Sequence, residues 1–185
     1  MDEGRHEEAI AEFDLALFSG GSVAAAFHNR ALAEQRTGGL SSAIKDYTRS
    51  IELDPELAFP YQNRASAYLE TGNRQSALAD FEKAVSLDPA SVPAWYNLGV
   101  VHEDLGELGK AVENYGQAII LQRDNIDALT NRALVYSKLG EHASAIEDMD
   151  RVVEIDPTYA KAYLVRASAH AKLGVTPQTR QSPLA

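Results

Sequence analysis

Cysteine is absent from this chain of 185 residues, so neither a disulfide framework nor a thiolate nucleophile or metal ligand is available. Long apolar runs are also missing, because no stretch approaches the roughly 18 residues that a membrane-spanning helix needs. No signal-peptide pattern opens the chain either. These absences predict an intracellular, cytoplasmic protein without a membrane partner.

Basic residues are scarce: 17 Lys and Arg stand against 27 Asp and Glu, which gives a net charge of −10. Nucleic-acid binding rests on basic patches that displace counterions from the phosphate backbone. The charge balance therefore argues against a nucleic-acid partner. The apolar fraction of 45% is ordinary for a globular domain.

One segment is repeated at a fixed period. Residues 131–157, NRALVYSKLGEHASAIEDMDRVVEIDP, match residues 63–89 after a shift of 68 and residues 29–55 after a shift of 102. Both shifts are multiples of 34. A period of this length is typical of a solenoid, in which each unit buries its apolar face against its neighbours.

The repeat predicts a single array over residues 1–174. It divides into a half repeat 1–23, full repeats 24–57, 58–91, 92–125 and 126–159, and a capping helix 160–173. We expect residues 175–185 to form a disordered tail. The third repeat departs most from the pattern, because Gly109 and Gly116 lie in its second-helix region and Arg123 replaces the proline of the other repeats.

Each repeat contains two amphipathic patterns on either side of a glycine. A glycine at a helix end is typical of a residue with positive φ, and the recurring ones are Gly38, Gly72, Gly106, Gly140 and Gly174. Small residues recur where the helices must approach each other, with aromatic or large apolar residues beside them. Pro55, Pro89 and Pro157 are expected to end the second helices, since the residue before a proline is disfavoured in the α region.

With these residues at this spacing, the chain resembles the tetratricopeptide repeat family over residues 5–174. The resemblance implies an all-α fold, a right-handed superhelical solenoid of antiparallel helix pairs. It also implies that the first helices of the pairs line a concave groove.

In such a groove, the second, fifth, sixth and ninth residues of each first helix should be accessible to a ligand. One asparagine per repeat falls there, and its amide offers both a donor and an acceptor to a peptide backbone. Asparagine is also common at this position in the family, so a structural role stays equally open. The residues that we predict to bind a peptide are Asn29, Asn63, Asn97, Asn131, Phe59, Gln62, Tyr96, Thr130, Leu134 and Lys161.

Chaperone co-factors of the same family use a clamp of lysines, asparagines and an arginine to hold a C-terminal carboxylate. Asn131 and Lys161 match that clamp, whereas Tyr96, Val100 and Val165 do not. We therefore expect a peptide with hydrophobic anchors instead of a clamped carboxylate.

Arginine and aspartate covary within the chain. Arg30, Arg64 and Arg132 are each followed sixteen residues later by an aspartate, at positions 46, 80 and 148. The third repeat has Leu98 and Asn114 instead, so both members are lost together. The pattern predicts an ion pair between the two helices of a unit; ligand binding by the arginines is the alternative.

No pattern for catalysis is present. The five histidines are the only candidates for a general base or a metal ligand, and His102 and His170 stand where tyrosines pack in other repeats. Phosphate-binding glycine loops, nucleophile elbows and metal-spaced histidines are missing. We predict a protein that is not an enzyme, with no cofactor and no metal.

Three functions are consistent with this pattern. The first is an interaction module or scaffold that binds a peptide segment of a protein partner in the groove. The second is a structural segment of a larger array or oligomer, acting through its ends or its convex face, including self-association through the uncapped N-terminal helix. The third is a regulatory domain of a larger enzyme. Repeat modules serve many pathways, so the fold does not choose among them.

Overall fold

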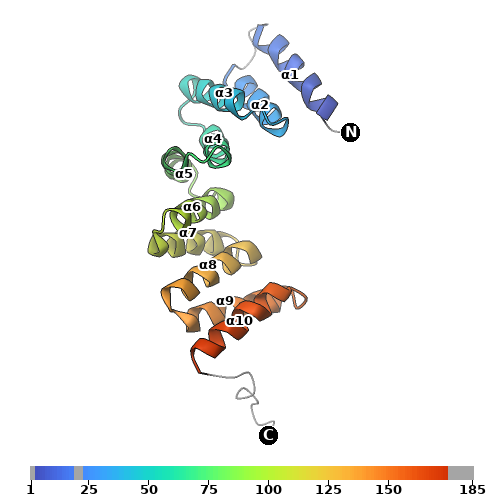
Figure 1. The fold of residues 1–185 in the computed structure, drawn as a ribbon. Helices are drawn as coiled ribbons and strands as arrows, with labels where there is room; N and C mark the ends of the chain where they lie inside the picture. The colour runs from blue at the N-terminus through green and yellow to red at the C-terminus, as the bar shows by residue number, and fades with distance from the viewer. Residues whose placement is uncertain (1–2, 19–22, 175–185) are drawn as a thin grey trace. The chain divides into compact units, whose positions relative to one another are not determined.

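The computed structural model describes residues 3–18 and 23–174, and over these residues it consists of α-helices without a β-strand (Figure 1). The helices are α1 (Glu3–Phe18), α2 (Val23–Arg36), α3 (Leu40–Leu53), α4 (Ala58–Glu70), α5 (Arg74–Leu87), α6 (Val92–Asp104), α7 (Leu108–Leu121), α8 (Ile126–Leu139), α9 (His142–Ile155) and α10 (Ala160–Lys172). The predicted tail, residues 175–185, lies outside the described residues.

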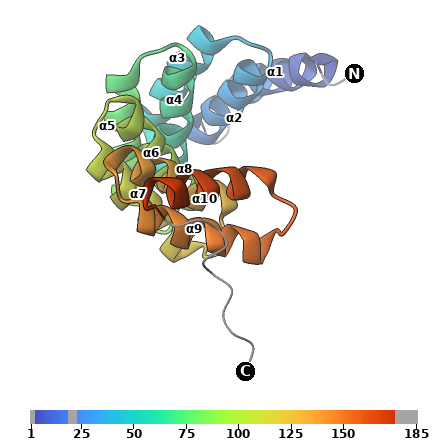
Figure 2. The same ribbon diagram turned by 60° about the horizontal axis from the view of Figure 1, so that its bottom comes forward.

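The chain forms two compact units, Met1–Val101 and His102–Ala185. In the first unit α2 packs against α1, α3 and α4, and α4 also packs against α3 and α5. In the second unit α8 packs against α7, α9 and α10. The two views agree that α9 and α10 lie side by side (Figures 1 and 2).

The turn between the helices of a repeat uses the predicted glycine. Gly140 follows α8 with φ 81°, a left-handed conformation that glycine adopts without steric cost. The amide of Glu141 then donates to the carbonyl of Tyr136 at 2.8 Å, which satisfies a carbonyl that the helix end would otherwise leave free. The other four glycines of the set also have positive φ, between 70° and 82°. This prediction is confirmed.

The second helices end where the sequence predicts. Helix α3 stops at Leu53, and Asp54 takes an extended conformation before Pro55, as the proline ring favours. Helix α7 stops at the corresponding Leu121 and Gln122 is equally extended, although no proline follows. Proline therefore reinforces this corner without being necessary for it.

The small residues allow close helix contact. Ala31, Ala65 and Ala133 on first helices have no exposed surface. The same is true of the small residues Ala43, Ala77, Ala111 and Ala145 on second helices, and of the large ones Tyr47, Phe81, Tyr115 and Met149. Each repeat therefore buries one bulky side chain and one alanine of its second helix, and in the first unit Ala31, Ala43, Tyr47 and Ala67 pack into one hydrophobic cluster.

The predicted ion pairs between helices are present. The Nε and Nη2 atoms of Arg64 donate to the carboxylate of Asp80 at 2.7 and 2.8 Å, a bidentate geometry. Arg30 binds Asp46 in the same way, and so does Arg132 with Asp148. These arginines join the two helices of a repeat, which confirms the structural interpretation of the covariation.

Candidate peptide-binding groove

In the first unit a hollow of about 390 Å³ lies between α2 and α4. Its lining residues are Leu32, Gln35, Arg36, Asn63, Ser66 and Glu70. Counted from the starts of repeats 24–57 and 58–91, Leu32, Asn63 and Ser66 are sixth or ninth residues, which the repeat predicts to be accessible on the groove side. The hollow combines an apolar side chain with amide, hydroxyl and charged groups, as small binding sites commonly do.

In the second unit a smaller hollow of about 240 Å³ lies between α8 and α10. Leu134, Leu164, Val165 and Ser168 line it together with Ser137. Three of these five side chains are apolar, and Leu164 is 72% exposed. An apolar anchor of a ligand would be desolvated here, whereas the hollow of the first unit offers more hydrogen bonds.

The other predicted residues differ in their exposure. Asn29, Phe59 and Lys161 are exposed, and Asn97, Asn131, Tyr96 and Gln62 are half-buried. The side-chain carbonyl of Gln62 already accepts a hydrogen bond from the hydroxyl of Ser91 at 2.9 Å. These residues are therefore within reach of solvent on the first helices.

Thr130 is different, because only 1% of its surface is exposed. Its hydroxyl has no hydrogen-bond partner among the described residues. A peptide on the surface would not reach this side chain unless α8 moved. The spacing predicts a groove position for Thr130, but the structure buries this side chain.

A polar network at the groove was not predicted. The hydroxyl of Tyr47 donates to the side-chain carbonyl of Gln35 at 2.9 Å, and the amide nitrogen of Gln35 donates to Glu70. In the second unit Tyr115 donates to Glu103 at 2.9 Å, and Lys138 donates to the same carboxylate at 2.7 Å.

The sequence contained a signal for this network. The repeats with a tyrosine at the buried second-helix position, Tyr47 and Tyr115, have a polar residue twelve positions earlier, Gln35 and Glu103. The repeat with Phe81 at that position has Leu69 instead. A buried hydroxyl needs a partner and a phenyl ring does not. The covariation of tyrosine with a polar residue twelve positions earlier therefore indicates a contact between the two helices, as the Arg–Asp covariation does.

Burial shifts the pKa of several groups near the first hollow. It raises the pKa of the Tyr47 hydroxyl and that of the Glu34 carboxyl, and it lowers the pKa of His28 below the ordinary 6.5. The His28 ring lies 5.7 Å from the ring of Tyr47. These shifts follow from packing.

Two further properties concern the described part of the chain. None of its helices has the length and apolar character needed to cross a bilayer. Among the same residues, no cluster of three or more His, Asp or Glu side chains could hold a metal ion. The predictions of a cytoplasmic location and of no cofactor stay predictions.

Comparison with known proteins identifies the repeat. Models of the tetratricopeptide repeat match residues 63–128 and 126–159, which together span more than half of the chain. A search of curated proteins finds no match. The family matches confirm the predicted fold class, an all-α solenoid of 34-residue repeats.

Solved structures are similar in fold. A crystal structure of MamA protein is 26% identical with a TM-score of 0.80, and the match covers 84% of this chain and 85% of MamA. YrrB, described as a tetratricopeptide repeat protein with an unusual peptide-binding site, is 22% identical with a TM-score of 0.80 over 91% of this chain and 85% of its own. At that identity the likeness shows the fold alone.

A third structure contains a ligand. The first tetratricopeptide repeat domain of Spaghetti (RPAP3), bound to an HSP90 peptide SRMEEVD, is 25% identical with a TM-score of 0.62. The match covers 63% of this chain and 93% of that domain. Proteins with this fold generally act as interaction scaffolds without catalysis.

Proposed function

We propose that this chain, which belongs to the tetratricopeptide repeat family, is a non-enzymatic interaction module that binds a peptide segment of a protein partner along its first helices. The observation that carries the proposal is the hollow between α2 and α4, which Asn63 lines together with Leu32 and Ser66. A similar hollow between α8 and α10 is lined by Leu134 and Val165. The RPAP3 domain, which is similar in fold, binds an HSP90 peptide, and this supports a peptide as the ligand class.

The two hollows suit different parts of a ligand. In the first, the side-chain amide of Asn63 can donate a hydrogen bond to the backbone of an extended peptide and accept one from it. Such contacts do not depend on the side chains of the peptide. In the second, the exposed Leu164 and half-buried Leu134 favour an apolar side chain of the ligand. Burial of such an anchor contributes about 25 cal/mol per Å² of apolar surface. The proposed ligand is therefore an extended segment with at least one hydrophobic anchor.

Selection of peptides from a displayed random library on the wild-type protein tests this proposal. Peptides that bind are then titrated by calorimetry against Asn63→Ala and Leu134→Glu. Gln117→Ala is the matched control, because Gln117 is exposed on the second helix α7 and lines neither hollow. Thermal melts confirm that each variant is folded.

We expect the selected peptides to bind at least about tenfold more weakly to either groove variant and equally well to the control. If Asn63→Ala leaves the affinity unchanged, the asparagine is structural. If neither groove variant weakens binding, recognition lies outside the first helices and the proposal is wrong.

Self-association through α1 is a second candidate, favoured by its exposed apolar side chains. Leu15 is 63% exposed and Phe18 is 94% exposed, whereas Ile10, Phe13 and Leu17 are half-buried. A second copy of the chain that packed against α1 would remove Leu15 and Phe18 from water. Analytical ultracentrifugation over a range of concentrations measures this association directly.

A further inference from the structure

Four first helices have an arginine at the same position: Arg30, Arg64, Arg132 and Arg166. In three of them the Nη1 atom donates to a side chain sixteen residues earlier, on the preceding second helix. Arg30 donates to Asp14, Arg64 to the hydroxyl of Thr48 at 2.9 Å, and Arg166 to Asp150 at 2.7 Å. The geometry of the repeat thus aims Nη1 at one position of the neighbouring helix, and the protein places an oxygen acceptor there.

Arg132 lacks this acceptor. Its Nε and Nη2 atoms bind Asp148 at 2.8 and 2.6 Å, but the residue sixteen positions earlier is Gly116. A Cβ atom at Gly116 would lie 3.5 Å from Nη1, so the atom faces the place where a side chain of α7 would stand. Among the described residues no group accepts a hydrogen bond from this Nη1.

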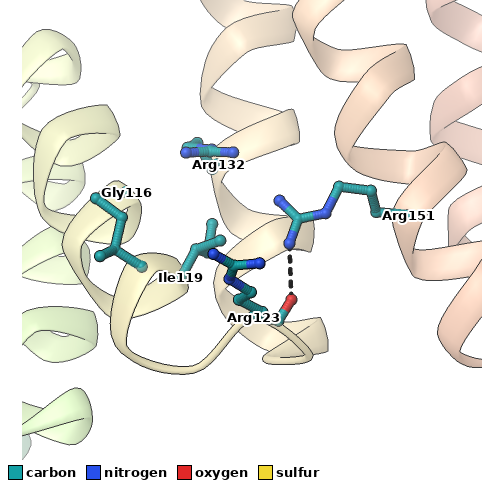
Figure 3. A pocket seen from close by; sticks show the side chains of 6 residues that line it. Gly116, Ile119, Arg123, Arg132 and Arg151 are labelled. Carbon is teal, nitrogen blue, oxygen red and sulfur yellow. Dashed lines mark hydrogen bonds between the residues drawn. The ribbon is translucent and has the colours of Figure 1, made fainter.

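Two other arginines border the same space. Arg123 lies in the connection after α7, and Arg151 lies on α9 and donates from Nη2 to the carbonyl of Arg123 at 2.8 Å. With Gly116, Ile119, Ile120 and Arg132 they line a hollow of about 500 Å³, and Figure 3 shows the guanidinium groups around it. In the described part of the chain, neither Arg123 nor Arg151 is paired with a carboxylate.

The hollow therefore concentrates positive charge in an acidic protein. Three guanidinium groups border it, and Asp148 is the one carboxylate bound to them in the described residues. Like charges in a partly desolvated site repel one another, so an anion that enters is favoured by Coulomb attraction and by charge-assisted hydrogen bonds. Ile119 and the exposed Ile120 add an apolar wall beside the charges.

We propose that this hollow, the α7–α9 arginine site, binds an aspartate or glutamate side chain from an acidic segment of a partner protein. The bound carboxylate would take the place beside Arg132 that Asp14 takes beside Arg30 and that Asp150 takes beside Arg166. Arg123 and Arg151 would contact its second oxygen or the next acidic residue, and an apolar neighbour would pack on Ile120. The site shares no residue with the hollow between α8 and α10, so it is a separate contact surface.

The glycine provides a matched pair of variants. Gly116→Asp supplies the carboxylate from within the chain, as the equivalent Asp14 and Asp150 do, and should occupy the site. Gly116→Ala adds only a Cβ at an ordinary contact distance and should leave the site open. Arg123→Gln with Arg151→Gln removes charge but leaves the Arg132–Asp148 bridge intact.

The probe is the acetylated, amidated peptide Asp-Leu-Asp-Leu-Asp, with its Asn-Leu-Asn-Leu-Asn counterpart as the uncharged control and inorganic phosphate as a third ligand. Binding is followed by NMR at low ionic strength, because salt screens exposed charges. The signals of interest are the arginine Nε–Hε groups and the Gly116 amide. Melting temperatures verify that every variant is folded.

We expect the acidic peptide to shift the signals of Arg123, Arg132 and Arg151 in a saturable way, and the asparagine peptide to shift none of them. Gly116→Asp and the double arginine variant should each weaken binding at least about tenfold, whereas Gly116→Ala should retain it. Equal binding to Gly116→Asp, or equal shifts with the asparagine peptide, would overturn the proposal. Saturation by phosphate without any response to the acidic peptide would also overturn it, because the site would then recognise a phosphate group.

Discussion

Replacement of Arg64 should strongly lower the stability of the repeat, because this side chain on α4 connects three helices. It binds Asp80 on α5 through two hydrogen bonds and the hydroxyl of Thr48 on α3 through a third. Its guanidinium also lies 5.8 Å from the ring centroids of Tyr61 and Tyr68. The side chains of Arg64 and Asp80 are 15% and 8% exposed, so the pair is sheltered from water.

The expected magnitude follows from that burial. Arg64→Leu leaves the carboxylate of Asp80 buried without a counter-charge, and breaking a sheltered pair in this way costs about 3 kcal/mol. Asp80→Asn on top of Arg64→Leu removes the stranded charge, and it reproduces the residue types of the third repeat, Leu98 and Asn114. We expect the double variant to regain at least about 2 kcal/mol, since replacing both partners of a buried pair is often nearly neutral.

The free energy of unfolding is measured by urea denaturation of the wild type, both single variants and the double variant. A loss of 3 kcal/mol corresponds to a fall in Tm of roughly 6–12 °C for a chain of this length. Arg49→Leu is the control: Arg49 pairs with Glu52 at 2.8 Å, but the two side chains are 53% and 55% exposed, so the change should be below about 1 kcal/mol. If the losses from Arg64→Leu and Asp80→Asn simply add in the double variant, the two residues are not coupled and the reasoning is refuted.

Three further perturbations test other parts of the structure. Gly140→Ala should lower the free energy of unfolding by about 1 kcal/mol, because φ at this position is 81°. Gly116→Ala should raise it by a similar amount, because Gly116 lies inside α7 and alanine favours the helix. If urea denaturation gives both changes the same sign, the assigned backbone conformations are wrong. Burial holds the pKa of His28 below 6.5, so the unfolded chain binds the proton first and stability falls as the pH drops below about 6.5. His28→Gln should flatten that part of the pH profile, and an unchanged difference between pH 7.5 and 5 would refute the assignment. Leu15→Glu with Phe18→Glu should abolish any self-association through α1 in the ultracentrifuge; persistence of the oligomer would place its contact elsewhere.

The repeat made much of the fold predictable from the sequence. Several helix boundaries have a local cause, such as the glycine with positive φ or the aspartate before a proline, so they could be predicted position by position. Long-range contacts were predictable only where two positions changed together within the chain. The clearest case is the ion pair of Arg64 with Asp80. The third repeat has Leu98 and Asn114 at the equivalent positions, so the repeats can be compared with one another and both partners are seen to change together.

Side-chain direction at single positions was less predictable. Thr130 has the spacing of a groove residue, yet its surface is buried, because helical periodicity does not determine how neighbouring helices close over one side chain. The hydrogen bond from Tyr47 to Gln35 does not follow from the apolar pattern, because tyrosine fits that pattern as a bulky residue although its hydroxyl needs an acceptor when buried. This hydrogen bond becomes predictable only when the residue types twelve positions apart are compared between repeats.

The arginine site shows why a departure from the repeat carries information that the repeat itself does not. In the sequence, Gly116 is one of the departures of the third repeat from the pattern, and a glycine inside a helix costs roughly 1 kcal/mol relative to alanine. In three dimensions the same glycine removes the acceptor that Arg30, Arg64 and Arg166 each have, and it does so where Arg123 and Arg151 add two more charges. An aspartate at position 116 would accept a hydrogen bond from Nη1 of Arg132 and would reduce the repulsion among the three arginines, whereas the glycine supplies no acceptor. The glycine thus leaves beside Arg132 the place that the proposal assigns to a carboxylate from outside the chain.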